Sequence, residues 1–441
     1  MSVCARSQRG FSWWLWAVPG DEAPLAAYLV GLLQRAGLEA ALVETPRGAS
    51  RVGRAAAWGM LRGTGERPPL VLLSHLDTVP VDAERWHEDP FAGIERDGYV
   101  IGRGAQDAKG VAVIQLLALL ELARREQPLA RDVIFLATPD EESGGRNGAG
   151  WLVREHRSLL RGARFLLTEG GGVLHRPRGA PTWQVAVTEK SPCWLRITAK
   201  GPPGHSSVPS GADAVPRLLD ALAAFRQLKD DVRVVPSVQR MFATLAPASP
   251  AADRRAFADL RRSLARDPAF RQRFLAQPAY AALVRDTTSL TVLEGGARTN
   301  VLPAEAAAHV DARLLPGSTC SDFATRVRQR VRAPGVAVET LLSFRSAASP
   351  IDSPLYRAVA SVAQRRDPAA VVVPRVNAGF TDAHWFREIG IEAYGFVPRW
   401  HELGESRGVH GPNERISIEN LERGIETLVE IVEELDRQDT T

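Results

Sequence analysis

A histidine and an aspartate two residues apart, His75 and Asp77, directly follow an apolar run at residues 69–73. Such a run is typical of a fully buried strand. Residues i and i+2 of a strand point to the same side, so both side chains should project together from its carboxyl end, where open α/β sheets place their sites. Imidazole and carboxylate are zinc ligands, but a pair of this kind is more often structural. The interpretation of this pair as a metal site is strengthened only by similar residues later in the chain.

More acids and another histidine occur further along, most of them just after an apolar run. The further candidates are Asp107, Glu141, Glu142, Glu169 and His410. Each has a plain alternative: a helix N-cap for Asp107 and a solvated helix start for Glu141 and Glu142. Glu169 precedes three glycines and could lie in an ordinary loop, and His410 could lie in a surface turn. Their joint occurrence favours a site for two metal ions, with one carboxylate bridging them.

A two-metal hydrolase also needs a carboxylate that moves protons without binding metal. Neighbouring residues point in different directions, so one of Glu141 and Glu142 can bind an ion while the other takes the proton. Asp77 suits a supporting role, in which it accepts the second ring N–H of His75.

Strands that alternate with helices must position these residues. Strands are predicted at residues 38–43, 69–73, 132–137, 163–167, 370–373 and 393–397, and helices at 23–36, 111–123 and 418–435. This alternation predicts an α/β fold with a mostly parallel sheet flanked by helices. The acidic clusters should then line one edge of the sheet.

The pattern changes near residue 190. The next elements have a β-α-β-β-α-β order, with strands at 193–199, 289–294, 304–314 and 336–342 and helices at 211–228 and 320–331. This order predicts an inserted α+β ferredoxin-like lid domain. The expected division is a catalytic domain at 1–188 and 346–441 and a lid at 189–345, with a helical insertion at about 230–286.

Bulk composition excludes several classes of protein. The 441 residues carry a net charge of +4 without a clustered basic stripe, which argues against nucleic-acid binding. No apolar run approaches the ~18 residues of a membrane span. The Trp-rich segment at residues 11–18 is expected to be a surface or packing segment of a cytoplasmic protein, although secretion stays open. Cys4, Cys193 and Cys320 are predicted to form neither a disulfide framework nor a metal site.

Beyond these patterns, the chain resembles the dinuclear zinc hydrolases that include aminoacylase, acetylornithine deacetylase, succinyl-diaminopimelate desuccinylase and glutamate carboxypeptidase. The resemblance extends from about residue 19 to the end of the chain. It rests on Ser74-His75-Leu76-Asp77-Thr78-Val79-Pro80, residues 102–110, Asp140-Glu141-Glu142-Ser143-Gly144-Gly145, residues 201–209, Asn300-Val301-Leu302-Pro303, Asp311-Ala312-Arg313 and His410-Gly411-Pro412-Asn413-Glu414.

The resemblance implies a role for each candidate. His75 and Glu169 would bind one zinc, Glu142 and His410 the other, and Asp107 would bridge them. Glu141 matches the general base and acid, and Asp77 the carboxylate that orients His75. The family pattern also implies a cis peptide bond between Asp107 and Ala108. Two Zn²⁺ per chain are expected, with Co²⁺ or Mn²⁺ as substitutes.

The lid would contribute to the substrate site. His205 matches a histidine that polarises the scissile carbonyl, often in the partner subunit's site, and a homodimer through the lid is therefore expected. Asn300 and Arg313 match residues that bind the substrate carboxylate, and a planar guanidinium suits that task. Thr381 lies in a loop that matches the substrate side.

Residues 268–270, 283–288 and 300–303 are similar to the branch that holds Gly-X carboxypeptidase and the N-fatty-acyl amino acid hydrolases. The expected function is hydrolysis of an amide or peptide bond next to a free carboxylate by a metal-activated water. The substrate would be a small peptide or an N-acyl amino acid. The alternatives are a catalytically silent binding relative, the reverse acyl-transfer direction and a phosphoesterase. The insertion either shapes an acyl-chain site or packs on the lid.

Overall fold

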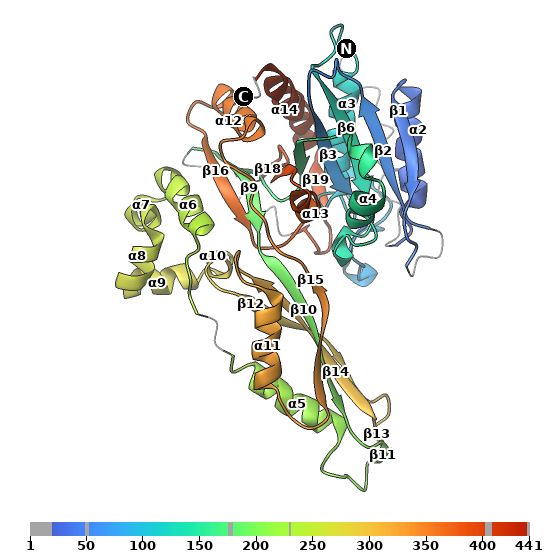
Figure 1. Cartoon of the computed structure of the whole chain (residues 1–441), viewed down its shortest axis with the longest axis vertical. Helices are drawn as coiled ribbons and strands as arrows, with labels where there is room; N and C mark the ends of the chain where they lie inside the picture. The colour runs from blue at the N-terminus through green and yellow to red at the C-terminus, as the bar shows by residue number, and fades with distance from the viewer. Residues whose placement is uncertain (1–19, 49–52, 175–179, 229–230, 402–407, 439–441) are drawn as a thin grey trace.

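The computed structural model describes residues 20–48, 53–174, 180–228, 231–401 and 408–438. Cys4 and the Trp-rich segment at 11–18 lie outside this range. Figure 1 shows a large sheet flanked by helices, from which a narrower second body extends. This arrangement confirms the predicted fold class, a mostly parallel catalytic sheet with a separate antiparallel lid sheet.

The large sheet contains ten strands in the described residues. Its strands lie in the order β1 (Glu39–Glu44), β2 (Ala55–Leu61), β6 (Arg131–Thr138), β3 (Arg67–His75), β7 (Phe165–Thr168), β17 (Glu392–Gly395), β9 (Thr182–Glu189), β8 (Gly172–Leu174) and β18 (Trp400–His401), and β16 (Val371–Asn377) pairs with β9. At its centre β6, β3 and β7 are parallel neighbours. The carboxyl ends of these three strands therefore meet at one edge.

Helices cover both faces of this sheet, which explains the unbroken apolar run of β3. Leu70 and Leu72 pack into one core with α2 (Ala23–Arg35), α3 (Lys109–Leu122), α12 (Pro354–Arg366) and α14 (Ile418–Arg437). Val71 and Leu73 point the other way, into a core with α4 (Ala149–Glu155) and α13 (Ala383–Glu388). A strand that is buried on both faces has no solvent-facing position, so its sequence is a continuous apolar run and does not alternate between apolar and polar residues.

The sequence patterns missed several elements of this body. β2 reads Ala-Ala-Ala-Trp-Gly-Met-Leu, a composition that does not favour a strand. It is a strand because it pairs with β1 on one side and β6 on the other. β9 and α12 were also not predicted. A further small sheet of β19 (Arg415–Ser417), β5 (Tyr99–Ile101) and β4 (Ile94–Arg96) lies next to the start of α14.

The lid has the predicted ferredoxin-like order. Its elements are β10 (Ser191–Lys200), α5 (Ala214–Phe225), β12 (Thr287–Glu294), β14 (Glu305–Leu314), α11 (Cys320–Arg330) and β15 (Val336–Ser343). The antiparallel sheet runs β12-β14-β10-β15, with α5 and α11 packed on one face. A short pair, β11 (Gly204–His205) and β13 (Val301–Leu302), forms the tip that lies farthest from the catalytic sheet (Figure 1).

The prediction for the cysteines was wrong in one respect. Cys193 and Cys320 form a disulfide whose Cα atoms lie 5.2 Å apart, although 127 residues separate them in sequence. Cys193 lies near the start of β10 and Cys320 opens α11, and both contribute to the same lid core. Wide spacing in the sequence gave no sign of this proximity, because the packing of α11 on the sheet creates it.

The helical insertion packs on the catalytic sheet and also contacts the lid, as one prediction had it: Leu315 belongs to its core, and Arg233 Nη2 donates to Ser318 Oγ. It consists of α6 (Pro236–Leu245), α7 (Ala251–Ala258), α8 (Leu260–Arg266), α9 (Pro268–Leu275) and α10 (Pro278–Leu283). Phe242, Phe257, Phe270 and Phe274 form its aromatic core. Val373 and Val376 of β16 belong to the same core. The insertion thus covers one side of β16, as Figure 1 shows at α6.

Within the described residues, no helix has both the length and the apolar character that a membrane crossing requires.

Candidate metal centre

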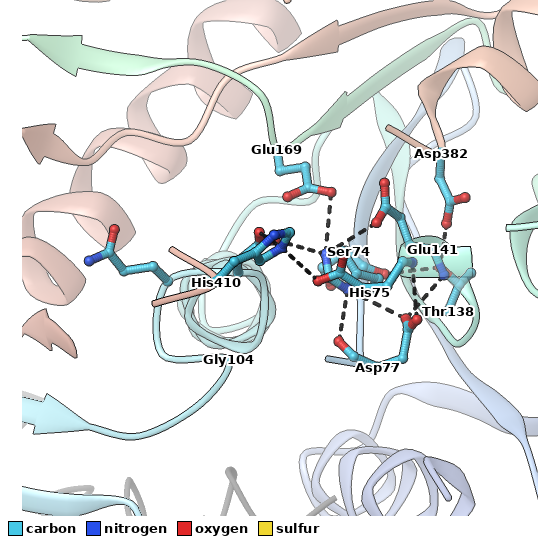
Figure 2. A network of polar contacts seen from close by, with 12 residues as sticks. Ser74, His75, Asp77, Gly104, Thr138, Glu141, Glu169, Asp382 and His410 are labelled. Atoms are coloured by element: carbon cyan, nitrogen blue, oxygen red, sulfur yellow. Dashed lines mark hydrogen bonds and ion pairs between the residues drawn. The ribbon is translucent and has the colours of Figure 1, made fainter. Parts of the chain in front are cut away.

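Three neighbouring strands deliver the predicted residues to one edge of the sheet. His75 is the last residue of β3. Glu141 and Glu142 lie on a short 3₁₀ helix, η3 (Glu141–Ser143), shortly after β6, and Glu169 directly follows β7. Asp107 comes from the turn before α3, and His410 from the segment before β19. Figure 2 shows the side chains of His75, Glu141, Glu169 and His410 converging.

Asp107 lies between the two histidines. Its Oδ1 is 3.1 Å from His75 Nε2, and its Oδ2 is 3.2 Å from His410 Nε2. Glu169 Oε1 is 3.4 Å from His75 Nε2, and Glu142 Oε1 is 3.2 Å from His410 Nε2. The peptide bond between Asp107 and Ala108 is cis, as the resemblance implied. One carboxylate therefore faces two histidines, each of which has its own second carboxylate.

This donor set fits two divalent cations. Ligand atoms of His75, Asp107 and Glu169 all lie within 4.8 Å of one another, and so do those of Asp107, Glu142 and His410. The two groups share Asp107. Imidazole nitrogens with carboxylate oxygens suit zinc and related first-row ions, and a shared carboxylate is the usual bridge between two such ions. The structure thus brings together all five residues predicted to bind metal.

The pKa shifts show a site that favours positive charge. Hydrogen bonds to Asp107 and Glu142 raise the pKa of His410 to about 10. Burial opposes protonation of His75, yet Glu169, Asp107 and Asp77 raise its pKa well above the usual value. Burial raises the pKa of Glu169 to about 7, with repulsion from Asp107 adding to it. Carboxylates this closely packed are stabilised by a cation between them.

Glu141 is not in either group that shares Asp107, and it forms a third group with His75 and Glu142. Its Oε2 is 3.9 Å from His75 Nε2, and its side chain is buried. Burial, reinforced by the charge of Glu169, raises its pKa well above the usual value. A carboxyl with a raised pKa next to a metal centre is suited to take up a proton and release it again.

Asp77 does more than orient His75. His75 Nδ1 is 3.0 Å from the backbone oxygen of Asp77 and 3.4 Å from its Oδ1. The carboxylate also accepts the backbone N–H groups of Glu141 and Glu142, each at 3.1 Å. Asp77 therefore ties the β3 histidine to the β6 loop that carries both glutamates. The pattern of alternate strand residues predicted only the first of these contacts.

Sequence reasoning gave no role to Glu414. This buried carboxylate accepts hydrogen bonds from Arg103 Nη1 at 2.6 Å and from the backbone N–H groups of Gly104, Gln106 and Asp107 at 3.1, 2.7 and 3.0 Å. It therefore holds the turn that presents Asp107. The available signal was an acid four residues after His410, in the same motif.

Replacing Glu414 by glutamine should weaken metal binding, because the Asp107 turn loses the charge that gathers its N–H groups. Loss of such supporting contacts costs roughly 10–100-fold in metal affinity. Zinc affinity measured by competition with a chelator tests this prediction, and Glu419→Gln, an exposed acid on α14, is the matched control. Equal affinities of Glu414→Gln and wild type would contradict the role of Glu414.

A cavity of about 620 Å³ opens above this centre. Thr381 and Arg313, predicted to contact substrate, both line it. The Thr381 hydroxyl donates to Glu189 Oε2 at 3.1 Å. Arg313 already pairs with Asp311, through Nε at 2.7 Å and Nη2 at 2.9 Å, and its guanidinium lies over the ring of Phe380. Arginine has five N–H donors, so donors remain for a ligand carboxylate.

His205 and Asn300 do not line this cavity. Both lie at the tip of the lid: His205 is in β11, and Asn300 O accepts the backbone N–H of Ser206 at 3.2 Å. Figure 1 shows β11 and β13 far from the catalytic sheet. Thr381 and Arg313, predicted to bind substrate, therefore lie beside the metal centre, whereas Asn300, also predicted to bind substrate, and His205, predicted to polarise the carbonyl, lie at the far end of the lid.

The fold and the metal centre define the chain as a hydrolase of the dinuclear-metal type. The model of peptidase family M20/M25/M40 matches residues 71–434. The chain belongs to this family.

Two curated relatives illustrate its range. The N-fatty-acyl-amino acid synthase/hydrolase PM20D1 of Xenopus tropicalis is 30% identical over 379 residues, which cover 83% of this chain and 72% of the relative. Aminoacylase-1 of Mus musculus is 28% identical over 376 residues, covering 82% and 79%.

Solved structures share the fold over nearly the whole chain. Human carnosine dipeptidase 1 superposes with a TM-score of 0.75 at 18% identity, covering 98% of this chain and 96% of the other. The M20 metallo-carboxypeptidase Sso-CP2 of Sulfolobus solfataricus also has a TM-score of 0.75 at 18% identity, with 99% and 100% covered.

Proposed function

We propose that the protein is a zinc-dependent hydrolase that cleaves an amide or peptide bond next to a free carboxylate. The substrate would be an N-acyl amino acid or a small peptide. The observation that carries this proposal is the arrangement of the carboxylates. Asp107 is shared by two groups of donors, while Glu141, which has a raised pKa, lies within reach of His75 and Glu142 but outside the two groups that share Asp107.

The chain's own residues would divide the work between metal binding and proton transfer. His75, Asp107, Glu142, Glu169 and His410 would hold two zinc ions, which supply Lewis acidity for the carbonyl and lower the pKa of a water. Glu141 would accept the proton of the attacking water and deliver it to the leaving amine. Asp77 would hold His75 and the backbone of Glu141 in fixed positions relative to each other through its hydrogen bonds to both.

The free carboxylate of the substrate would bind Arg313. Its guanidinium lines the same cavity as Glu141. It lies over the ring of Phe380 and forms an ion pair with Asp311. This fixed orientation reduces the entropy lost when a carboxylate binds. Arg313→Ala is therefore expected to act mainly on the KM of substrates with a free carboxylate.

A substrate screen tests the proposed function. The zinc-loaded protein is assayed against N-acyl amino acids of increasing acyl length, C-terminal dipeptides, their carboxamide counterparts and phosphate esters. The proposal is supported if the rate of hydrolysis of carboxylate-bearing amides is at least about tenfold higher than that of their carboxamide counterparts. Turnover of phosphate esters alone would overturn it, and two bound metals with no turnover of any substrate would favour a silent binding relative.

We further propose that His205 and Asn300 act in the site of a second copy of the chain. The lid offers a surface for such a dimer: β12 is an edge strand, and Leu290, Val292 and Leu293 on it are 39%, 40% and 69% exposed. An open edge strand with exposed apolar residues is a frequent site of self-association. His205 would then donate a hydrogen bond to the carbonyl oxygen as negative charge develops.

Mixing two inactive variants should restore activity if His205 acts across the dimer. His205→Ala is expected to lose about 10²–10³ of turnover, the usual cost of removing one oxyanion donor. A mixed dimer of His205→Ala with Glu141→Ala contains one complete site, so random exchange should recover about a quarter of wild-type turnover.

The control for this experiment is a mixture of Glu141→Ala with Asp107→Ala, which cannot assemble a complete site. Light scattering gives the mass in parallel. A monomeric protein with full activity, or a His205 mixture no more active than its two components, would contradict action across the dimer.

A further inference from the structure

The helical insertion, residues 236–283, carries the positive net charge of the whole chain. It contains eight arginines and three aspartates and no lysine, glutamate or histidine, which gives it a net charge of +5. The remaining 393 residues contain 47 basic and 48 acidic side chains. Arginine is frequent throughout the chain, but outside the insertion acidic residues balance it in number. The proposed hydrolysis gives the insertion no role.

The arginines of the insertion are on its outside, and we call them the arginine surface. All eight are exposed and lie on α6, α7, α8 and α9: Arg240, Arg254, Arg255, Arg261, Arg262, Arg266, Arg271 and Arg273. The apolar residues between them, such as Phe257, Leu264 and Phe274, belong to the core shared with β16. This helical spacing hides the cluster in the sequence, where the arginines form no long basic run.

The three aspartates of the insertion already have partners. Asp259 and Asp267 cap α8 and α9, where their Oδ1 atoms accept backbone N–H groups at 3.2 and 2.9 Å. Asp253 forms an ion pair with Arg273 at 3.7 Å. Within the described residues, no other arginine of the arginine surface forms an ion pair with a carboxylate. Seven guanidinium groups therefore carry a charge that no ion pair of the described chain offsets.

The arginine surface continues from one helix to the next. Arg240 of α6 and Arg261 of α8 line the same hollow of about 440 Å³. α7 packs against α6 and α8, and α9 packs against α8. Figure 1 shows these four helices as one group on the outer side of β16. The eight guanidinium groups therefore lie on adjoining helices and not in separate parts of the molecule.

The insertion presents no apolar or aromatic anchor to a partner. No large hydrophobic residue of the insertion is exposed, and its four phenylalanines are at most 3% exposed: Phe242, Phe257, Phe270 and Phe274. Protein interfaces are usually centred on aromatic or aliphatic anchors, and single-stranded nucleic acids stack their bases on aromatic side chains. A layer of anionic lipid headgroups needs neither, because it attracts basic residues that are spread over a surface.

The insertion adjoins the substrate cavity across a single strand. Val373 and Val376 of β16 belong to the core of the insertion, whereas Arg375 and Asn377 of the same strand line the cavity. The backbone N–H of Val376 also donates to Met241 Sδ of α6 at 3.4 Å. Docking through the insertion would therefore bring the strand that borders the cavity close to the bound surface.

We propose that the helical insertion docks the protein on an anionic lipid bilayer through the arginine surface. Each basic residue near such a bilayer strengthens binding about fivefold, so several arginines together give stable attachment. The attachment is electrostatic, because no large hydrophobic residue of the insertion is exposed to enter the lipid. Docking would bring the cavity to amphiphilic N-acyl amino acids held in the bilayer, and this consequence alone rests on the proposed function.

Co-sedimentation of the full chain with phospholipid vesicles tests this proposal. At about 0.1 M salt, wild type should bind phosphatidylcholine vesicles that contain about 30% phosphatidylserine at least about tenfold more tightly than pure phosphatidylcholine, and about 0.5 M salt should release it. The arginine variant changes four side chains that form no hydrogen bond or ion pair within the described residues: Arg240→Gln, Arg255→Gln, Arg262→Gln and Arg266→Gln. It should bind the anionic vesicles at least about 100-fold more weakly.

The control variant makes the same change in net charge elsewhere on the molecule. It replaces four exposed arginines outside the insertion: Arg35→Gln, Arg124→Gln, Arg157→Gln and Arg332→Gln. It should bind the anionic vesicles within about threefold of wild type, because attraction to the headgroups falls off within a Debye length. Equal losses in the two variants would assign the binding to net charge and refute a role of the insertion. Thermal unfolding of both variants checks the fold.

Further arms cover the remaining outcomes. If the arginine variant does not fold, the double variant Arg262→Gln/Arg266→Gln on α8 replaces it and should bind about 10–30-fold more weakly than wild type. Wild-type binding that does not respond to headgroup charge or salt contradicts the proposal. Tighter binding to a DNA duplex of about 20 base pairs than to the anionic vesicles at the same salt would replace the lipid surface by nucleic acid. No arm uses catalysis, so absence of amide hydrolysis would overturn only the proposed function.

Discussion

A Glu141→Ala variant is expected to bind metal like wild type and to lose about 10²–10⁴ of its turnover, the usual contribution of a general acid–base group. The physical reason is that the two glutamates after β6, Glu141 and Glu142, have different roles. Glu142 approaches His410 within 3.2 Å, whereas Glu141 lies in neither group that shares Asp107. Its removal takes away the proton carrier and leaves the shared ligands in place.

The measurement combines metal content after dialysis with kcat on the best amide from the screen. Glu126→Gln, an exposed acid after α3, is the control for a lost carboxylate and should retain full activity. An unchanged Tm would show that the fold is intact. A metal-loaded Glu141→Ala protein with turnover like that of wild type would refute the assignment.

Asp107→Ala should differ from Glu141→Ala, because it should lose bound metal and activity together. Asp107 contacts His75 through one oxygen and His410 through the other. Both ions would lose a ligand at once, and two like-charged ions would lose the carboxylate between them. Bound zinc should fall from about two per chain to well below one.

Glu169→Ala is the matched comparison, because Glu169 belongs to only one of the groups that contain Asp107. It should retain about one ion per chain. If Asp107→Ala keeps both ions while Glu169→Ala loses both, Asp107 is not the bridge. Mass spectrometry under native conditions counts the ions directly, so the result does not depend on activity.

The metal centre was accessible to sequence reasoning because its residues obey a simple rule. His75, Glu141 and Glu142, and Glu169 come at or just after the ends of three buried apolar runs. Parallel strands bring their carboxyl ends to one edge, so order along the chain translates into proximity. Period-2 and period-3.6 patterns likewise predicted the ferredoxin-like lid, because local hydrophobic spacing sets those elements.

Contacts between distant segments were not accessible in this way. Glu414 reaches the Asp107 turn although 307 residues separate the two in sequence, and Cys193 meets Cys320 only through the packing of α11. The alanine-rich β2 is a strand only because two partners flank it. In each case the deciding interaction is tertiary, and no local pattern encodes it.

The sequence, together with the family resemblance, therefore predicted the class of chemistry: which side chains could hold two metal ions, which acid is expected to move a proton, and which sheet edge carries them. Only the tertiary structure decided how the substrate site is divided. It put His205 and Asn300 at the far tip of the lid and Arg313 against Asp311. The physical reason is that metal ligands lie where each strand ends, whereas substrate contacts depend on how separate bodies of structure face one another.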